Sequence, residues 1–396
     1  MIPRLKPRLG LSELAAALQF WERNGVEVFE AEFAARMGQD HALAFPYGRT
    51  GLQLLLEAMG LQNKEIICPA YTCVVVPHAI VYSGNTPVFV DCAPDDFNMD
   101  LDLAEQAITE NTGAIIPTSL FGYPVDLDRL NAVRNHHPDV KIIQDCAHSF
   151  QAGWNSRPVN KEGIAALYGL NISKLLTSIF GGMITTDDHT LYRKLKAHRD
   201  ERQSPPSWQK GLKRFLYLMA VYPTFWGPVY GMVNRLERSG LIDRFVRYYD
   251  ETSIDMPDDY LIGMSPVEGR VGRANLHKYD RIIASRRDAA QYYHEILPHR
   301  PDFIHPPVVN GATYSHYVVE VQDRQWWLQQ GLKRGVQLGW LIEYTIPEMN
   351  AYGSHPPDAF PNAARLARHT INLPVWGGSA VAKRVVNCIR LLLDFA

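Results

Sequence analysis

The chain has 396 residues, of which 46% are hydrophobic and 21% are charged, which is typical of a globular protein with one large or two ordinary domains. Its 40 basic and 42 acidic residues nearly balance, so charge gives no argument for nucleic-acid binding. The five cysteines form no metal-ligand spacing, and their odd number argues against a disulfide framework, so no metal site is expected. The first ten residues, MIPRLKPRLG, lack the apolar core of a signal peptide, which indicates a cytoplasmic protein.

Between residues 50 and 200, short apolar runs alternate with amphipathic stretches. The apolar runs are predicted as buried strands, at residues 65–70, 87–91, 114–118, 141–145, 166–170 and 183–186. The amphipathic stretches are predicted as helices, at residues 50–60, 102–109, 125–137 and 188–201. Strands that alternate with helices indicate βαβ units and a mainly parallel sheet, in which ligands bind beyond the carboxyl ends of the strands.

Residues 201–260 interrupt this alternation with an insertion rich in proline and aromatic residues. Within it, residues 215–234 (FLYLMAVYPTFWGPVYGMVN) carry no charge and have basic residues on both sides. Three interpretations stay open. The segment is buried at a subunit or domain interface, or it makes a peripheral contact with a membrane surface, or it spans a membrane. Its prolines and glycines argue against a continuous spanning helix.

The last third of the chain predicts a second, smaller α/β unit. Residues 265–297 are typical of one long helix, with breaks expected at Gly269 and Gly272. A strand is predicted at 317–321 and a helix at 325–335. The predicted organisation is therefore a large domain at 1–200, the insertion at 201–260 and a small C-terminal α/β domain at 261–396.

Two short motifs place polar groups at the ends of predicted elements. In YGRTG, Gly48 and Arg49 open a helix, where free backbone N–H groups and a guanidinium suit a phosphate. In IIQDCAHS, Asp145 ends an apolar strand and His148 follows it, and a carboxylate there can keep a cofactor ring nitrogen protonated. Each motif has an ordinary alternative. The first is equally typical of a helix cap with a surface arginine, and the second of a capping aspartate with a structural histidine.

Lys174 is the only charged residue in the segment NISKLLTSIFGGMITT, residues 171–186. Burial lowers the pKa of a lysine and makes its amine a nucleophile toward carbonyl groups, although a lysine that reaches solvent from a strand end is the ordinary alternative. Gly181 and Gly182 permit a tight turn into the next strand. A phosphate cradle, an acidic partner for a ring nitrogen and a reactive amine, in that order, match what pyridoxal 5'-phosphate (PLP) requires.

The sequence resembles the DegT/StrS family of PLP-dependent sugar aminotransferases. The resemblance covers nearly the whole chain outside residues 201–260 and is carried by the segments GRTGLQL, PAYT, TPVFVDCAPDDFNMD, AIIPTSLFGYPVDLDRL, IQDCAHSFQAGWNSRPV, ISK, GGMITTDD, MSPVEGRVGRANLHKYDRIIASRR and INLPVW. It implies an α/β, type I PLP-dependent transferase fold, with a mainly parallel central sheet in the large domain.

The resemblance also implies roles for individual residues. Lys174 would carry the cofactor as a Schiff base and then move the proton during catalysis, while Asp145 would pair with the pyridine nitrogen. His148 would contact the phenolic oxygen of the cofactor, and Gly48 and Arg49 would form the phosphate turn. Family members are dimers with active sites at the subunit interface, so a homodimer is expected.

Three positions depart from the family pattern around the phosphate. Arg49 stands where threonine or serine is common, and Gly169 stands where a second phosphate-binding serine is expected. Leu261 stands where many members have an asparagine that reaches the phosphate of the neighbouring subunit. We expect Arg49, together with Asn171, to replace these contacts.

Further departures concern the cofactor ring and the substrate. Cys73 stands where a ring-stacking aromatic residue is usual, which leaves open whether Tyr71 covers the ring. Glu343 stands where members often have a histidine that faces the sugar. The expected substrate pocket consists of Tyr314, His316, Glu343 and Tyr344.

The sequence thus predicts an aminotransferase that moves an amino group from L-glutamate to a keto sugar for lipopolysaccharide or surface polysaccharide. The acceptor stays open between a nucleotide-linked keto sugar, a free keto sugar such as the 8-keto form of Kdo, and a lipid-linked sugar. Dehydratases of the family replace the lysine with histidine, so Lys174 argues against that activity. A PLP-binding regulatory or sensor protein with little catalysis is the remaining alternative.

Overall fold

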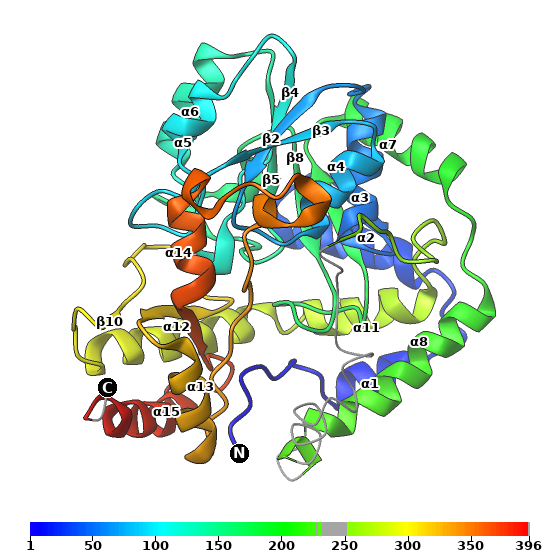
Figure 1. Cartoon of the computed structure of the whole chain (residues 1–396). Coiled ribbons are helices and arrows are strands. Elements are labelled where there is room, and N and C mark those ends of the chain that lie inside the picture. Colours follow the sequence, from blue (N-terminus) through cyan, green and yellow to red (C-terminus); the bar gives the residue numbers. More distant parts are fainter. Residues whose placement is uncertain (226–228, 232–251, 395–396) are drawn as a thin grey trace.

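The computed structural model describes residues 1–225, 229–231 and 252–394, and its largest feature is a seven-stranded sheet (Figure 1). The strands of this sheet are, in spatial order, β1 (His41–Phe45), β9 (Gly182–Thr186), β8 (Ala165–Gly169), β5 (Lys141–Asp145), β4 (Thr112–Ile115), β2 (Glu65–Pro69) and β3 (Thr86–Val90). The last five run parallel, and β9 is antiparallel to both of its neighbours. The predicted α/β fold with a mainly parallel sheet is therefore confirmed.

Helices cover both faces of this sheet. They are α2 (Gly25–Met37), α3 (Gly48–Ala58), α4 (Val75–Tyr82), α5 (Leu101–Gln106), α6 (Leu127–His136) and α7 (His189–Arg202). Successive side chains of a strand point to opposite faces, so Ile67 packs in the core with α2, α5 and α6, whereas Ile66 and Cys68 pack in the core with α3, α4 and α7. Burial on both faces explains why the strands appear in the sequence as continuous apolar runs.

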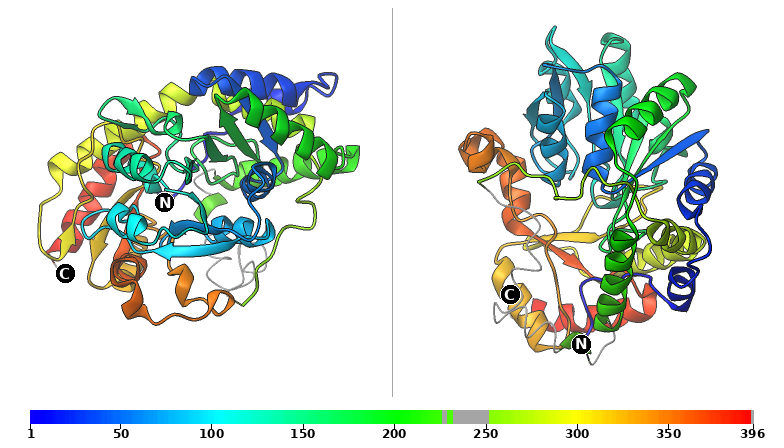
Figure 2. Two further views of the ribbon diagram at one scale, coloured as in Figure 1. Left: turned by 90° about the horizontal axis from the view of Figure 1, so that it is seen from above. Right: turned by 90° about the vertical axis from the view of Figure 1, so that its right-hand side faces the viewer.

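The C-terminal part forms a second core below the large sheet in Figure 1 and in the right-hand view of Figure 2. Its antiparallel sheet consists of β10 (Phe303–Ile304), β11 (Tyr317–Val321) and β12 (Thr370–Leu373). Its helices are α12 (Tyr279–Ile296), α13 (Arg324–Lys333), α14 (Pro361–His369) and α15 (Gly378–Leu393). A short hairpin, β6 (Gly153–Trp154) and β7 (Arg157–Pro158), completes the strands of the described residues.

The prediction of where helix 265–297 breaks is wrong. The structure has two helices, α11 (Pro266–Leu276) and α12, which are separated at His277–Lys278, while Gly269 and Gly272 lie inside α11. A Cβ atom on Gly269 would lie 2.5 Å from the carbonyl oxygen of Gly25, and one on Gly272 would lie 2.6 Å from the ring of Phe29. These glycines therefore let α11 approach α2 closely rather than interrupting the helix.

The boundaries of the three predicted domains stay a prediction. The packing adds that the end of α11 and the start of α12 lie on the first core, because Leu276, Tyr279 and Ile282 are buried there with residues of the large sheet. The later part of α12 is buried in the C-terminal core, to which the N-terminus also contributes Ile2. The N-terminus and α12 thus connect the two units.

The insertion begins with α8 (Trp208–Val221), which packs with α1 (Leu11–Ala17) around α11 (Figure 1). Of the uncharged segment 215–234, the structure describes residues 215–225 and 229–231 only. The interpretations of this segment that concern its other residues lie outside the described part of the chain. Among the described helices, none has both the length and the apolar character that crossing a membrane requires. Interface and membrane-surface contacts of this segment both stay open.

Candidate active site

The carboxyl end of β5 presents a buried carboxylate, that of Asp145. The N–H of Ala147 donates to its Oδ1 at 2.9 Å, and the hydroxyl of Thr118 donates to its Oδ2 at 3.1 Å. Burial raises the pKa of Asp145, and the two hydrogen bonds and the charge of Lys174 oppose that shift. Each oxygen accepts one bond and has capacity for another, so the carboxylate can still receive a cationic donor.

Lys174 lies five residues beyond β8, in a turn closed by a hydrogen bond from its N–H to the carbonyl oxygen of Asn171. Burial lowers the pKa of Lys174, and the sulfur of Cys73 and the carboxylate of Asp145 oppose that shift. A Cβ atom on Gly169 would lie 3.2 Å from the Cε of Lys174 and 3.5 Å from the Cβ of Ala147. The glycine at 169 therefore leaves room for the stem of this lysine.

The helix α3 begins at Gly48, next to the strand that follows Lys174. A Cβ atom on Gly182 would collide with the backbone of Gly48, and Gly181 has a φ of +130°, so both residues of this pair require glycine. The first turn of α3 holds no acidic residue, and its first N–H groups have no partner within the helix. In the described part of the structure, the buried hydroxyl of Thr50 in this turn also lacks a hydrogen-bond partner. The helix start therefore suits an anion.

The guanidinium of Arg49 extends from this helix start toward the chain at Asp255. Its Nη1 donates to the carbonyl oxygen of Asp255 at 3.2 Å and lies 3.8 Å from the Oδ1 of that residue. The ring of His78 on α4 approaches the same carbonyl, with its Nδ1 at 3.1 Å. Burial and the charge of Arg49 lower the pKa of His78. Among the described residues, the carboxylate of Asp255 is the one that pairs with Arg49, and it is exposed.

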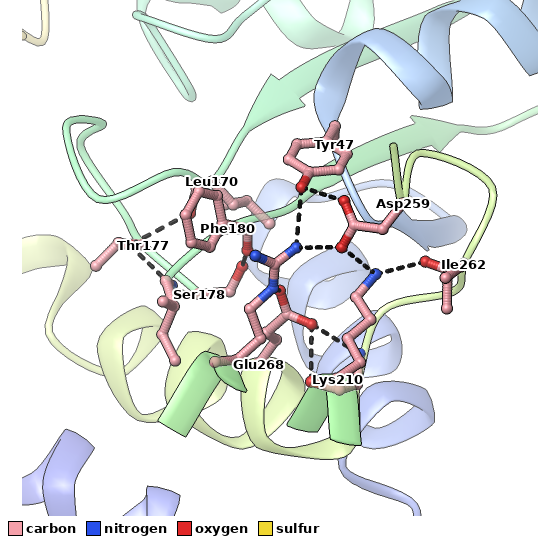
Figure 3. Close-up of polar contacts among 12 residues, drawn as sticks. Tyr47, Leu170, Thr177, Ser178, Phe180, Lys210, Asp259, Ile262 and Glu268 are labelled. Carbon is pink, nitrogen blue, oxygen red and sulfur yellow. Dashed lines mark hydrogen bonds and ion pairs between the residues drawn. The ribbon is translucent and has the colours of Figure 1, made fainter. Parts of the chain in front are cut away.

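A network of ion pairs supports the turn from the other side (Figure 3). Arg214 of α8 donates to the hydroxyl of Tyr47 at 2.9 Å and to Asp259 at 2.8 Å, and it pairs with the buried Glu268 at 3.0 Å. Tyr47 donates to Asp259 at 2.6 Å, and Lys210 lies 3.5 Å from the same carboxylate. Because Tyr47 directly precedes Gly48, the insertion helix and residues 259–268 help to hold the start of α3.

The other predicted cofactor residues, His148, Asn171 and Tyr71, differ in the contacts that hold them. His148 is buried, stacks on Phe121 and has its pKa lowered, first by burial and then by Lys174. Asn171 is engaged locally, because its Oδ1 accepts from the N–H and hydroxyl of Ser173 at 3.0 and 2.6 Å. Tyr71 is fully buried, with its hydroxyl 3.3 Å from both Ile342 O and Thr370 Oγ1. The hydroxyl of Tyr71 is therefore held in a core contact with the C-terminal part.

Two of the four predicted substrate residues lie beside the cofactor residues. The ring of His316 is 5.9 Å from the ring of His148. The hydroxyl of Tyr344 accepts from the N–H of Val74, the neighbour of Cys73, at 3.2 Å. Tyr314 packs edge-on against Tyr123 instead, and Glu343 is exposed.

Sequence reasoning missed two contributors to this site. Thr118 follows β4 and holds Asp145, and its only sequence signal is its place at the end of an apolar run. Arg214 and its partner Asp259 lie in the insertion, which gave no signal of a link to Tyr47. Both contacts join residues that are far apart in the sequence.

Comparison with known proteins identifies the family of the chain. The model of the DegT/DnrJ/EryC1/StrS aminotransferase family matches residues 11–222 and 229–390. The chain belongs to this family. GDP-perosamine synthase of Caulobacter vibrioides is 26% identical over 352 residues, which are 87% of this chain and 80% of that protein. The spore coat polysaccharide biosynthesis protein SpsC of Bacillus subtilis is 25% identical over 394 residues, 95% of this chain and 92% of that protein.

Solved structures agree with the fold. The PLP form of Spr1654 from Streptococcus pneumoniae superposes with a TM-score of 0.76 at 20% identity, covering 98% of this chain and 97% of that one. As a member of the DegT/DnrJ/EryC1/StrS family, the chain is a PLP-dependent sugar aminotransferase that acts in amino-sugar or polysaccharide biosynthesis. The residues described above fit PLP, because a buried carboxylate with spare acceptor capacity, a buried amine and an anion-binding helix start surround the same strand ends.

Arg49→Ala is expected to weaken the binding of PLP to the chain roughly tenfold to a hundredfold, the loss typical of a hydrogen bond to a charged group. The expected cause is the loss of the one guanidinium at the start of α3. Absorbance titration of the PLP-free chain with PLP measures the dissociation constant. Arg193→Ala, which removes an exposed arginine of α7, is the matched control. An Arg49 variant with unchanged affinity would show that Arg49 makes no contact with the phosphate.

Proposed function

We propose that this aminotransferase moves the amino group of L-glutamate to a keto sugar, in the cytoplasm, for lipopolysaccharide or another surface polysaccharide. The observation that carries the proposal is the buried amine of Lys174 within electrostatic reach of the buried Asp145, beside a helix start that suits a phosphate.

PLP, when bound, supplies an electron sink that stabilises negative charge on a carbon atom that has lost a proton. Lys174 would hold the cofactor covalently through Nζ. Once an amino donor takes that place, the free Nζ accepts the proton of the donor α-carbon and later returns a proton to the acceptor. Asp145 would accept a hydrogen bond from the ring N–H and keep that proton on the nitrogen. Gly48, Arg49 and the first turn of α3 would orient the phosphate.

The acceptor that we favour is a nucleotide-linked keto sugar, since the name of the relative from Caulobacter vibrioides denotes a GDP-linked amino sugar. His316, beside His148, and Tyr344, beside Cys73, are the two side chains best placed to contact the sugar. Glu343 is a further candidate for contact with the sugar, because its side chain is exposed and it is adjacent to Tyr344. A free keto sugar and a lipid-linked one are the acceptors against which this proposal is tested.

A homodimer with active sites at the interface is part of the same proposal. The surface of α1, α8 and the turn between α1 and α2 exposes large apolar side chains, namely Leu11, Leu18, Phe20, Trp21, Trp208, Leu212, Leu216 and Met219. Phe20 and Phe215 contact each other with ring centroids 5.7 Å apart, so the turn between α1 and α2 meets α8 at this point. An apolar surface of this kind is typical of a protein interface. Sedimentation of the intact chain, alone and with anionic vesicles, distinguishes a second copy from a membrane as its partner.

The test of the proposed function uses the PLP-loaded chain. Its absorbance is expected to shift on addition of L-glutamate and to return on addition of an accepted keto sugar, with the product identified by mass. D-glutamate, which has the same charge and the opposite hand, is the control donor. Nucleotide-linked, free and lipid-linked keto sugars are compared as acceptors. A spectrum that no amino donor changes would favour the sensor, and amination of the free sugar alone would reject the nucleotide-linked acceptor.

A further inference from the structure

Three histidines converge on the surface of the C-terminal part, away from the residues assigned to PLP. His294 lies in the last turn of α12, His299 in the loop that follows, and His305 directly after β10. Each offers one ring nitrogen, and these three nitrogens lie within 4.8 Å of one another. The ring centroids are 5.2 Å apart for His294 and His299, 5.6 Å for His294 and His305, and 4.2 Å for His299 and His305.

The hydrogen bonds of His305 determine which of its nitrogens is available. Its Nε2 lies 3.1 Å from the carbonyl oxygen of Pro298, and a carbonyl oxygen only accepts, so Nε2 carries the hydrogen. Its Nδ1 is therefore an acceptor, and the hydroxyl of Tyr317 donates to it at 3.0 Å. A metal-bound histidine also donates its other N–H to a backbone carbonyl, so the Nδ1 of His305 could bind a metal if the Tyr317 hydroxyl gave way to it.

The other two rings have room to complete such a site. Within the described part of the chain, no hydrogen bond engages the ring nitrogens of His294 or His299, and His299 is exposed. Zinc–nitrogen bonds of 2.0–2.1 Å in a tetrahedral site place ligand nitrogens about 3.3 Å apart, so the rings need to close by at most about 1.5 Å. Rotations of the exposed ring of His299 and of the half-buried ring of His294 would have to supply this movement.

We propose that His294, His299 and His305 bind one divalent transition-metal ion, with the Nδ1 of His305 as one ligand and a water molecule in the open position. Three imidazoles and no carboxylate favour Zn²⁺, Ni²⁺ or Cu²⁺ over Mg²⁺ and Ca²⁺, which prefer oxygen ligands. The hydroxyl of Tyr317, released from His305, is then placed to hydrogen-bond the metal-bound water. The expectation of no metal site rested on the spacing of the five cysteines alone, and that spacing gives no signal of these histidines.

Such an ion would join the end of α12 to β10 across the loop of residues 297–302. An ion that binds the folded chain and not the unfolded one raises the stability of the fold by mass action. The ion would thus stabilise the side of the C-terminal core at which Phe303 and Trp327 pack. This role is independent of PLP and of the identity of the sugar.

The test titrates the full-length, PLP-loaded chain with Zn²⁺ in competition with a chromophoric chelator. We expect one zinc ion per chain and a higher unfolding temperature in its presence. His299→Ala, which removes an exposed ring, is expected to weaken binding at least about tenfold and to abolish the thermal shift. His305→Gln serves as a second variant. Replacement of zinc by Co²⁺ is expected to give the intense visible bands of a four-coordinate site.

The matched control is His189→Ala, because His189 and His41 form a close pair, 3.1 Å between ring nitrogens, to which the described residues add no third ligand. This variant is expected to bind zinc like the unchanged chain. Two outcomes would overturn the proposal: the absence of saturable binding at one ion per chain, or binding that survives both His299→Ala and His305→Gln. Loss of binding only in His189→Ala would locate the ion at the other pair and would equally reject the site.

Discussion

Lys174→Ala is expected to lower the rate of amino transfer by about 10⁴-fold, the upper end of what a positioned acid–base group contributes. The variant loses both the nucleophile that holds PLP and the group that moves the proton. The stem of Lys174 lies beside Gly169, which has no side chain that would lose a contact when the stem is removed. The truncation is therefore not expected to disturb the fold. The rate is measured as the conversion of L-glutamate and a keto sugar, followed by product mass.

Controls separate lost chemistry from lost structure. Lys174→Arg keeps the positive charge but not a neutral amine, so it is expected to be as inactive as the alanine variant. Lys194→Ala, at an exposed lysine of α7, is expected to be fully active. Added methylamine is expected to restore part of the activity of Lys174→Ala alone. Borohydride treatment of the PLP-loaded chain is expected to label residue 174, and an unlabelled Lys174 in folded protein would contradict the assignment.

The same lysine predicts a pH dependence. Burial lowers the pKa of Lys174, so its neutral, nucleophilic form is present at lower pH than for a free lysine, whose pKa is about 10.4. The rate at which the PLP-free chain captures PLP is therefore expected to rise with pH and to level off below that value. A rate that levels off with an ordinary lysine pKa would show that this amine is solvated.

Asp145→Asn is the second large effect, with an expected fall in the rate of amino transfer of roughly 10²–10³-fold, as for the loss of one group that stabilises charge at the reacting centre. The asparagine has the same size but no charge, so it cannot keep the ring nitrogen protonated. PLP is expected to bind still, because the phosphate turn and Lys174 are unchanged. The measurement is kcat, together with the absorbance of the bound cofactor.

The unfolding temperature of Asp145→Asn distinguishes a catalytic role of Asp145 from a purely structural one. Burial raises the pKa of Asp145, which means that the ionised carboxylate costs stability when the pH is above the pKa of the unfolded chain. Without PLP at neutral pH, Asp145→Asn is therefore expected to unfold at the same or a higher temperature than the unchanged chain. Asp139→Asn, at an exposed position just before the other end of β5, is the control and should change neither activity nor stability. A destabilised, fully active Asp145→Asn would refute the proposed role.

Much of the fold was predictable because its information is local. Strands buried on both faces, such as β2 and β5, appear as short apolar runs, and polar residues at their carboxyl ends mark a site edge whatever the packing of distant segments. Asp145 and Lys174 were found by this argument. The break between α11 and α12 was not, since glycine usually weakens a helix, and here Gly269 and Gly272 make the close contact with α2 that keeps α11 intact.

The strands of the large sheet from β2 onward, and the place of a carboxylate, an amine and a helix start near strand ends, followed from the sequence by itself, whereas β1, α2 and α4 were not predicted. Only the tertiary structure decided which groups surround them: Thr118 on Asp145, Gly182 against Gly48, and Arg214 of the insertion on Tyr47. It also decided that His294, His299 and His305, on a helix end, a loop and a strand end, converge at one point of the surface. The physical reason is the range of the interactions. Backbone periodicity and turn chemistry act between neighbours in the chain, whereas hydrogen bonds, ion pairs and steric contacts act between whatever segments folding brings together.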